Sequence, residues 1–455
     1  MSLPPGPSAP PLVQTLEWVY RPGEFMERCQ RRHGDLFSVR VGTFGVPGRD
    51  TGVVFVSDPA AIKSIFTGGA DLARVQDARM AMRPVFGERS VLLTDGDEHL
   101  HRRKLMLPPF HGERMTRYGE LMTEIADADL DSWPIGRPLA LHPCMQRITL
   151  EVILRAVFGL DEGRAHDEVR QRIAKLAADV ANPFAELIMG LPDRIGDVVV
   201  RVFQGTLDAL DEALYREIAR RREDPALEER EDILSLLVLA RDPEGGAMSD
   251  QELRDQLVTL LLAGHETTAT TMAWVMELLF RNPAAHRRLE EECASDEGDD
   301  RYLDAVIQEA MRLYPPLPVV DRLLAAPFEV GGYELPAGTI VAPCIYLAHR
   351  RPDVYPDPTA FRPERFLERP PETYSWIPFG GGIRRCLGAS FATFEMRVVL
   401  RTLLRRATLR PATARPERMH RRSIVIAPRH GVRAVLHGRR DATPQQPARE
   451  LASVP

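Results

Sequence analysis

Lysine is nearly absent from this chain of 455 residues, which contains only Lys63, Lys104 and Lys175. Arginine therefore supplies most of the 59 basic side chains, and 65 acidic side chains give a formal net charge of −6. A nucleic-acid-binding protein needs a surface or stripe of concentrated positive charge, and this balance gives no sign of one over the whole chain. We therefore expect no nucleic-acid partner.

Cysteine is also scarce, with five widely spread residues that show neither a CxxC pair nor a zinc-like spacing. This excludes a structural zinc site of the usual kind and a complete set of disulfides, and it favours a reducing compartment such as the cytoplasm. Long apolar runs are missing as well, and the N-terminus lacks the apolar core of a signal peptide. We expect no membrane span, and we interpret residues 1–20 as a proline-rich segment without a membrane anchor.

Complete nucleotide-binding fingerprints are also missing. Gly380 and Gly382 begin a GxGxxG match, but Arg385 stands where the third glycine should be, and no P-loop Gly-Lys-Ser/Thr sequence follows. The chain therefore has no recognisable flavin or nicotinamide module. Any electrons that its chemistry requires must come from another protein.

The hydrophobic pattern predicts a mainly α fold with small β-sheets. Apolar residues recur at helical spacing from about 120 to 281, whereas strand patterns occur at 36–41, 53–56 and 328–341. Residues 423–436 are interpreted as a hairpin that turns at 429–431. We expect one large domain over residues 21–437, and a polar, disordered tail over residues 438–455.

A glycine-rich segment, Phe379–Gly388, contains the most informative cysteine. Its glycines permit positive φ angles and close approach to a flat ligand, and Arg384 precedes Cys386 by two residues. A helix that begins near Leu387 would direct backbone N–H groups at the sulfur, as a metal-bound thiolate requires. The alternative is an ordinary turn beside a buried, inert cysteine.

Five residues of this segment, Phe379, Gly382, Arg384, Cys386 and Gly388, fill the pattern FxxGxRxCxG. In this the chain resembles the cytochrome P-450 family of haem-thiolate monooxygenases, of the soluble bacterial type. The resemblance implies the fold of that family, haem b as the cofactor, and axial ligation of its iron by Cys386, with Phe379 and Gly388 beside the haem. It also implies insertion of one oxygen atom of O2 into a hydrophobic molecule.

A long helix is predicted to begin at a capping box formed by Ser249 and Glu252 and to end before Asn282-Pro283. Its middle carries Ala-Gly-His-Glu-Thr-Thr at 263–268, where a glycine and a threonine weaken the regular helix and make room for a ligand. Taken alone, the segment could equally be a long helix with tolerated polar residues.

The same segment matches the family pattern (A/G)Gx(D/E)T(T/S). The resemblance implies that Thr267 and Glu266 are the catalytic pair that manages oxygen and protons. His265 occupies a variable position of that pattern, and we expect it to line the site or face solvent rather than to bind iron.

Four cationic or hydrogen-bonding residues are implied as contacts of the haem propionates. His99 and Arg103 fill the HxxxR pattern and lie one turn apart on a predicted helix, while Arg322 and Arg384 occupy the other usual positions. Without the resemblance, each would be interpreted as an ordinary surface residue.

A structural ion network is implied by two further patterns. Glu309 and Arg312 fill ExxR on a helix that ends at Pro315-Pro316, and Arg365 belongs to a segment similar to the PxRF of the family. By itself the first pair would be a common surface contact. The resemblance implies that these three residues lie together beneath the cysteine segment.

The substrate pocket can be assigned only by position in the family. Its expected walls are the loop at 70–93 and six residues, Leu260, Ala263, Pro318, Val319, Val320 and Ile424. Residues 184–189 are either a mobile lid or part of the core. An apolar chamber fits a fatty acid, a terpenoid, a steroid or a polyketide.

The expected partners are a ferredoxin and an NAD(P)H-dependent ferredoxin reductase, and the expected state is a monomer. We expect the ferredoxin to dock near Arg102, Lys104, Arg385 and Arg397, unless these are ordinary solvated charges. Two other functions are compatible with parts of this sequence, a haem-thiolate sensor that does not turn over and a cysteine hydrolase. The sensor has no need of Glu266-Thr267, and the hydrolase lacks a base near its cysteine.

Overall fold

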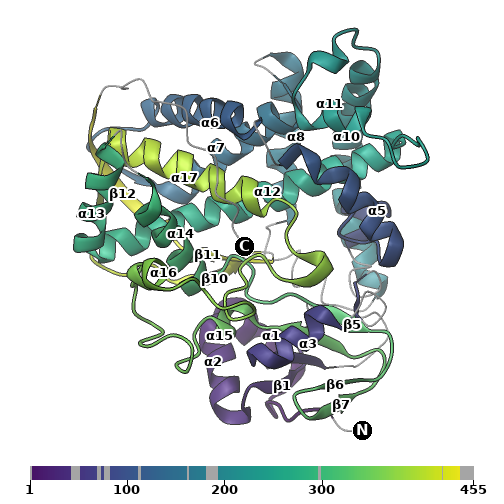
Figure 1. The fold of residues 1–455 in the computed structure, drawn as a ribbon, viewed down its shortest axis with the longest axis vertical. Helices are drawn as coiled ribbons and strands as arrows, with labels where there is room; N and C mark the ends of the chain where they lie inside the picture. Colours follow the sequence, from purple (N-terminus) through teal and green to yellow (C-terminus); the bar gives the residue numbers. More distant parts are fainter. Residues whose placement is uncertain are drawn as a thin grey trace.

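The computed structural model describes residues 3–42, 52–68, 73–75, 82–110, 114–160, 163–180, 193–295, 299–422 and 424–440. Helices dominate one part of the molecule, and the first sheet and the N-terminal helices form the other (Figure 1). The helices are α1 (Pro11–Tyr20), α2 (Pro22–His33), α3 (Pro59–Thr67), α4 (Arg83–Phe86), α5 (Gly96–Met106), α6 (Arg114–Asp131), α7 (Leu141–Val152), α8 (Arg164–Val180), α10 (Asp193–Arg222), α11 (Ile233–Leu239), α12 (Asp250–Arg281), α13 (Pro283–Ala294), α14 (Arg301–Leu313), α15 (Ile345–Ala348), α16 (Glu364–Glu368) and α17 (Ala389–Arg406).

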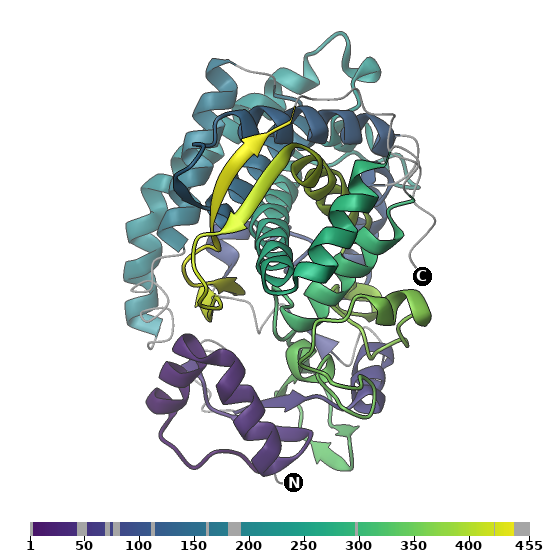
Figure 2. The same cartoon turned by 90° about the vertical axis from the view of Figure 1, so that its left-hand side faces the viewer.

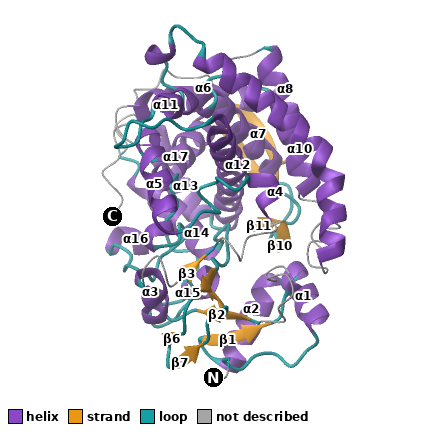
Figure 3. Ribbon diagram, turned by 90° about the vertical axis from the view of Figure 1, so that its right-hand side faces the viewer, coloured by secondary structure: helices purple, strands orange, loops and turns teal. Residues whose placement is uncertain are grey.

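Helix α12 runs through the middle of the helical part, with α7, α14 and α17 packed against it (Figure 3). The capping box predicted at its start is present: the Glu252 side chain accepts from the Ser249 N–H at 2.9 Å, and the Ser249 hydroxyl accepts from the Glu252 N–H at 3.3 Å. Asn282 ends the helix, as predicted. Because α12 is buried around most of its circumference, it fixes the positions of the helices around it.

The described strands form four small sheets. The largest has the order β1-β2-β8-β5-β3, in which only β2 and β8 are parallel. Beside the helices, β12 pairs antiparallel with β4 and with β9, and β9 and β12 lie side by side in yellow tones in Figure 2. The strands are β1 (Leu36–Val39), β2 (Val53–Val56), β3 (Ala73–Arg74), β4 (Pro138–Ala140), β5 (Arg322–Leu324), β6 (Phe328–Val330), β7 (Tyr333–Leu335), β8 (Ile340–Pro343), β9 (Ala407–Pro411), β10 (Met419–Arg422), β11 (Val425–Pro428) and β12 (Arg433–Arg439).

The hairpin predicted at 423–436 is wrong. Strand β11 pairs backwards with β10, with Arg422 opposite Val425, while β12 pairs with β9 and β4 instead. The turn residues at 429–431 therefore connect two different sheets. Strand β11 thus pairs locally, with the strand directly before it and ahead of the predicted turn, whereas β12 pairs with β9 and β4, which no local turn signal specifies.

Both predicted domain boundaries need correction. Residues 11–20 form α1, whose Trp18 is 1 % exposed and packs edge-on against Phe55 of β2, so this segment belongs to the folded domain. At the other end, β12 continues to Arg439, which pairs with Ala407. The predicted tail therefore cannot begin at Gly438, and residues 441–455 lie outside the described part of the chain.

Among the described helices, none has the length and apolarity to cross a membrane. The main hydrophobic core surrounds α12, and two smaller ones lie on the two faces of the first sheet. The cysteine segment follows β8 and α16 in the chain and leads directly into α17, so it lies where the sheet part and the helical part meet.

Candidate active site

The cysteine segment is a closed loop that ends at a helix. The Cys386 N–H donates to the Phe379 carbonyl at 2.8 Å, and a 3₁₀ turn at Gly382–Arg384 lies between them. Helix α17 begins at Ala389, and the Gly388 N–H is hydrogen-bonded to the Cys386 thiol. The loop therefore presents one sulfur atom, with a backbone donor aimed at it, at a helix N-terminus.

Glycine at position 382 is a steric requirement. Its φ of 66° lies in the left-handed region, and a Cβ there would lie 2.3 Å from the backbone oxygen of Phe66. Any larger residue would force the loop away from α3. The glycines thus allow the segment to pack tightly on one side while its cysteine remains open on the other.

Exposure separates Cys386 from the other cysteines. It is exposed, whereas the remaining four, Cys29, Cys144, Cys293 and Cys344, are buried. Burial raises the pKa of Cys293 to about 12 and that of Cys29 to about 11, which makes such thiols inert.

The sulfur of Cys386 is open to solvent, yet the surrounding protein still desolvates it. This burial raises the pKa of the Cys386 thiol, while the Gly388 N–H and the charges of Arg103 and Arg385 act in the opposite direction. A bound metal ion would therefore take up this sulfur as the thiolate, with support from donors and charges that are already in place.

Helix α5 carries two of the predicted haem contacts to the cysteine loop. His99 is buried, with Nδ1 2.9 Å from the Val91 oxygen and Nε2 3.2 Å from the Ile383 oxygen. Arg103 donates to the Arg385 carbonyl at 2.7 Å. Desolvation, reinforced by Arg384, lowers the pKa of His99, so its ring is neutral at pH 7.

Two arginines from distant parts of the chain line one cavity of about 390 Å³ beside the loop. Arg322 comes from β5 and Arg384 from the cysteine loop, and Phe66 of α3 lies between the elements that carry them. Arg384 also pairs with Asp95 and lies 3.4 Å from His99. Two guanidinium groups on one cavity suit an anionic, carboxylate-bearing ligand.

One face of α12 is open, in contrast to the rest of the helix. Ala263 is exposed, and Leu260, Gly264 and Thr267 are half-buried. Counted from Leu260, the other three residues follow at three, four and seven positions, which places all four on one face of the helix. The Thr267 hydroxyl donates to the Ala263 carbonyl at 2.8 Å. An exposed alanine in the middle of the most central helix indicates space beside it.

These observations fit a haem group. One accessible sulfur, that of Cys386, has a backbone N–H donor beside it, and the cations of Arg322 and Arg384 can bind two carboxylates. The central helix α12 has an open face of small residues. Among the described residues, no cluster of three or more His, Cys, Asp or Glu side chains offers a competing metal site. The residues therefore suit a metal that brings its own planar ligand rather than a metal held by protein side chains alone.

Comparison with known families decides the identity, because the Cytochrome P-450 family model matches residues 4–432. The chain belongs to the cytochrome P-450 family. Cytochrome P-450 135B1 of Mycobacterium bovis is 41 % identical to it, over 97 % of this chain and 93 % of the relative. Cytochrome P-450 137 of Mycobacterium tuberculosis is 38 % identical over 90 % of this chain and 84 % of the relative.

Solved structures agree with this assignment. A cyanobacterial CYP120A1 with bound retinoic acid matches with a TM-score of 0.81 and 26 % identity, over 96 % of this chain and all of that one. The haem domain of a cytochrome P-450DA mutant matches in fold, with a TM-score of 0.83 over 97 % of this chain and 98 % of that one, at 24 % identity. The mainly α fold with small sheets is thus confirmed, and so is the enzyme class, haem-thiolate monooxygenase.

The ExxR pair of this P-450 is fully buried. Arg312 donates through Nε and one terminal nitrogen to the two oxygens of Glu309, at 2.7 and 2.9 Å. Arg365 donates to the same carboxylate at 3.1 Å, and the Arg362 N–H does so at 2.8 Å. Because its remaining donors bond backbone oxygens of 349, 358 and 360, Arg312 fixes the chain that leads into the cysteine loop.

The predicted substrate residues have unequal environments. Pro318 is buried and its carbonyl accepts from the Tyr346 N–H, whereas Val319 and Val320 are half-buried and pack against the two smaller cores. Ile424 is 49 % exposed. The lid or core segment predicted at 184–189 lies outside the described residues, as do 70–72 and 76–81 of the predicted loop wall.

Two arginines expected at a redox-partner surface are engaged within this P-450. Arg102 is buried and pairs with Glu98 and Glu252, and Arg397 is buried and holds Asp304 with two bonds. Neither can meet a partner protein, because each satisfies a buried or half-buried carboxylate. Sequence spacing did not reveal these long-range pairs.

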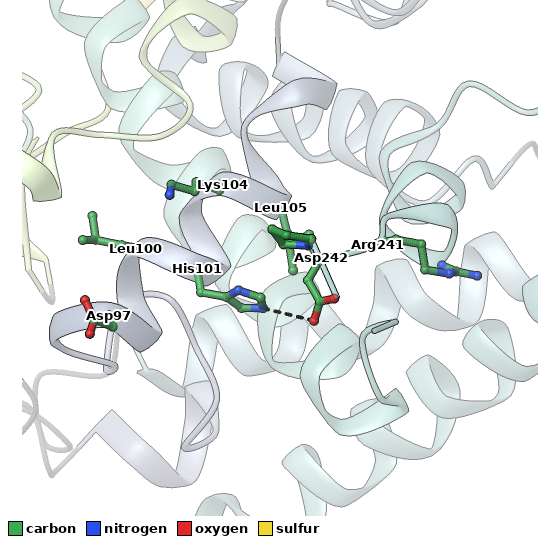
Figure 4. A pocket seen from close by; sticks show the side chains of 8 residues that line it. Asp97, Leu100, His101, Lys104, Leu105, Arg241 and Asp242 are labelled. Carbon is green, nitrogen blue, oxygen red and sulfur yellow. Dashed lines mark ion pairs between the residues drawn. The ribbon is translucent and has the colours of Figure 1, made fainter. Parts of the chain in front are cut away.

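A second cavity, of about 540 Å³, lies away from the cysteine loop, between α5 and the segment that precedes α12 (Figure 4). His101 of α5 points toward Asp242 there, with 3.9 Å between the ring and the carboxylate. The other labelled side chains come from the same two segments (Figure 4). None of the residues that line this cavity belongs to the cysteine loop.

Sequence reasoning missed the surroundings of Glu266. Its carboxylate accepts a hydrogen bond from Gln146 of α7, and His142 and Arg422 lie 3.5 and 3.9 Å from its other oxygen. These residues are at least 120 positions away in the chain, and no motif connects them. They come together because α7 packs against α12, and because β10, which carries Arg422, pairs with β11, which also packs against α12.

Proposed function

We propose that this P-450 inserts one oxygen atom of O2 into a hydrophobic small molecule, by hydroxylation or epoxidation, with Cys386 as the axial ligand of haem b. The balance is one O2, two electrons and two protons, which give an oxygenated product and one water. The observation that carries the proposal is the accessible Cys386 sulfur, distinct from four buried thiols, with the Gly388 N–H bonded to it.

Bound haem would supply the redox-active iron, and a thiolate ligand would donate the electron density that favours O–O cleavage. The residues of the chain would hold and tune this group. Cys386 would bind the iron, the Gly388 N–H would limit the charge on the sulfur, and Arg322 and Arg384 would receive the propionates, together with His99 and Arg103.

Thr267 and Glu266 would hold and deliver protons from α12. The Thr267 hydroxyl lies on the open face of α12 and is held by the Ala263 carbonyl, which fixes its oxygen in place. Glu266 would supply protons through this hydroxyl and ordered water. Exclusion of bulk water by the apolar face around Leu260 and Ala263 would limit proton leakage.

Electrons would come from a separate ferredoxin and its NAD(P)H-dependent reductase in the cytoplasm, because the sequence contains no nucleotide fingerprint of its own. The substrate class is a fatty acid, terpenoid, steroid or polyketide, in keeping with the apolar positions around the open face of α12. The retinoic acid in the cyanobacterial relative is a ligand of this general kind.

The test of iron ligation is a carbon monoxide difference spectrum of the reduced protein. The wild type and a Cys29→Ala control should give the band of thiolate-ligated haem, and Cys386→Ser should abolish it. A Cys386→Ser protein that keeps the wild-type band would disprove ligation by this sulfur.

The test of turnover is Thr267→Ala, with peroxide release measured against consumption of NAD(P)H. We expect the variant to release more peroxide per electron pair, since proton delivery falters while haem and reduction remain intact. If neither protein consumes oxygen with any electron donor, the haem-thiolate sensor is the better assignment.

A further inference from the structure

Asp95 occupies the N-cap position of α5, yet its side chain does not cap the helix. Aspartate is among the preferred residues at such a position, because its carboxylate can accept from the free N–H groups of the first turn. Among the residues that the structure describes, the Asp95 carboxylate makes no such bond to the start of α5. Other groups hold this carboxylate, and they indicate its role.

Two distant segments donate to the Asp95 carboxylate. The Val75 N–H, which directly follows β3, lies 3.0 and 3.2 Å from its two oxygens. In the cysteine loop, Nη2 of Arg384 donates to one of these oxygens and also to the Thr94 carbonyl. Asp95 thus connects α5 with the end of β3 and with the cysteine loop, and its contact with Arg384 spans 289 positions of the chain.

These contacts lie behind the cavity of about 390 Å³ beside the cysteine loop. Arg384 and Arg322 line this cavity, whereas Asp95 is not among its lining residues. Strand β3 pairs with β5, the strand that carries Arg322, with Arg74 opposite Leu323. Asp95 therefore bonds one of the two arginines directly, and it bonds the end of the strand that lies beside the other.

The geometry of arginine makes such a contact an orienting one. A guanidinium group is planar, and its donors form a fixed fork. Asp95 and the Thr94 carbonyl both hold Nη2 of Arg384, so they determine the direction of the rest of the group. The Arg384 side chain is only 7 % exposed. A side chain that is ordered in advance loses little further freedom when a carboxylate binds to it, and this strengthens binding.

The charge of Asp95 acts in the opposite direction. A carboxylate beside Arg384 offsets part of the positive charge of the arginine and repels the propionates of a bound haem. If charge were its main effect, Asp95 would weaken haem binding, and its removal would strengthen it. If orientation is its main effect, removal weakens haem binding. The two effects can therefore be separated by experiment.

We propose that Asp95 is a positioning residue for haem, which orients Arg384 toward the propionates and fixes the cysteine loop relative to β3. It acts through Arg384 and is not itself a haem contact. This inference rests on the proposed binding of haem b and goes beyond it, because Asp95 lies outside the HxxxR pattern of His99 and Arg103 and belongs to none of the other sequence patterns.

The first experiment measures the transfer of haem from the ferric, haem-loaded protein to an excess of apomyoglobin. Asp95→Ala should lose haem about tenfold faster, the factor expected for one lost hydrogen bond between charged groups. Asp95→Asn keeps an acceptor oxygen in the same place, so its rate should stay within about threefold of the wild type. Asp97→Ala is the matched control, because it removes the same side chain from an exposed position in the first turn of α5, and it should match the wild type.

The second experiment tests whether Asp95 acts through Arg384. In an Arg384→Gln background, Asp95→Ala should change the rate of haem loss by less than about threefold, since the group that it orients is missing. An equal effect of Asp95→Ala in both backgrounds would show that Asp95 only stabilises the surrounding chain, and it would overturn the positioning role.

The third experiment observes the propionates directly. The propionate-bending band in the resonance Raman spectrum depends on the hydrogen bonds that these groups accept. Asp95→Ala and Arg384→Gln should both move this band to lower frequency, because both weaken those bonds, whereas Asp97→Ala should leave it in place. A wild-type band in Asp95→Ala would contradict the proposal, and this measurement requires neither turnover nor an electron donor.

The outcomes separate this inference from the proposed function. If Asp95→Ala and Asp95→Asn both lose haem more slowly than the wild type, charge is the main effect and the positioning role is wrong. Asp95→Ser should behave like Asp95→Ala, and because its hydroxyl can cap α5, a folding failure of Asp95→Ala does not remove the test. A wild type without the carbon monoxide band of thiolate-ligated haem would overturn the proposed function as well, whereas normal bands with unchanged haem loss in every variant would overturn this inference alone.

Discussion

Two buried arginines organise two regions of this P-450, and they are not equally well satisfied. Arg312 in α14 and Arg221 in α10 are both fully buried. All five N–H donors of Arg312 have acceptors: the two oxygens of Glu309 and three backbone carbonyls. Arg221 pairs with Asp232 and Glu217 and bonds Ser235 and the Phe158 carbonyl, but its Nε has no partner among the described residues.

The difference concerns what each arginine holds. Arg312 connects α14 to the backbone before the cysteine loop, so its network bears on the proposed haem ligand. Arg221 joins α10 and α11 to the end of the π-helical turn, where no proposed cofactor contact lies. We therefore expect loss of the first network to remove haem, and loss of the second to remove stability alone.

The largest effect is expected from Glu309→Gln. The amide leaves the Arg312 charge buried and uncompensated, which should cost about 3–5 kcal/mol and prevent stable haem incorporation. Denaturant unfolding measures the loss of stability, and the carbon monoxide spectrum measures the loss of haem. Glu364→Gln breaks an exposed pair with Arg288 and should cost less than about 1 kcal/mol. Normal haem content in Glu309→Gln would remove the distinction between the networks.

A somewhat smaller effect is expected from Arg221→Met. It removes the fully buried cation of Asp232 and Glu217 and leaves them only the more exposed Arg230 and Arg220, so stability should fall by about 3 kcal/mol while the carbon monoxide band keeps its position. Adding Asp232→Asn should recover part of this loss, because the amide keeps the cap of α11 and removes one buried charge. An altered band in Arg221→Met would show that this region also reaches the haem site.

Acid should distinguish the regions further, because His349 belongs to the Arg312 network. Its Nε2 accepts from the Ile377 N–H at 2.7 Å, which requires a neutral ring, and burial together with Arg312 and Arg350 lowers its pKa to about 3. In the unfolded chain the pKa of a histidine is about 6.5, so below this pH the unfolded chain binds a proton that the folded chain does not. Stability from this residue is therefore complete above pH 6.5 and is lost as the pH falls.

By pH 5 the free energy of unfolding should have fallen by about 2 kcal/mol, since each pH unit below 6.5 lowers it by about 1.4 kcal/mol. His349→Gln offers a non-titrating acceptor to the Ile377 N–H, and it should flatten the stability profile between pH 6.5 and 5 when unfolding is measured at several pH values. Arg221→Met should keep the wild-type slope. An equally steep profile for His349→Gln would exclude this histidine as the cause.

The smallest effects are expected at the outer arginine of each network. Arg365 is 8 % exposed and donates to Glu309, whereas Arg230 is 28 % exposed and donates to Asp232. Lysine cannot reproduce the planar fork of either, so Arg365→Lys should cost about 1 kcal/mol and Arg230→Lys about half of that. Thermal unfolding of both variants tests whether Arg365→Lys costs more stability than Arg230→Lys. A larger loss in Arg230→Lys would show that burial does not decide the size of the effect.

Local patterns predicted much of this fold. The capping box at Ser249 and the stop at Asn282 gave the bounds of α12, because both signals act within one helical turn. The strand at 53–56 was also predicted from its own residues. The hairpin predicted at 423–436 was wrong, because β12 pairs with β9 and β4, which no local signal specifies, while β11 pairs with the strand directly before it.

The candidate site divides in the same way. The positions of Cys386, Thr267 and Glu309 follow from short motifs, and the structure brings Arg312 and Arg365 to Glu309 as those motifs imply. The partners Gln146 and Arg422 of Glu266 carry no motif. They meet Glu266 because α7 packs against α12 and because β10 pairs with β11, which also packs against α12.

The sequence by itself determined the family, the cysteine loop and the central helix, because each depends on residues within about ten positions of one another or on short, specific spacings. The tertiary structure alone decided which buried charges are satisfied, which arginines stay available at the surface, and on which side of α12 the acid is held. Hydrogen bonds and ion pairs are formed between groups that meet in space, and the order of residues along the chain does not state which groups those are.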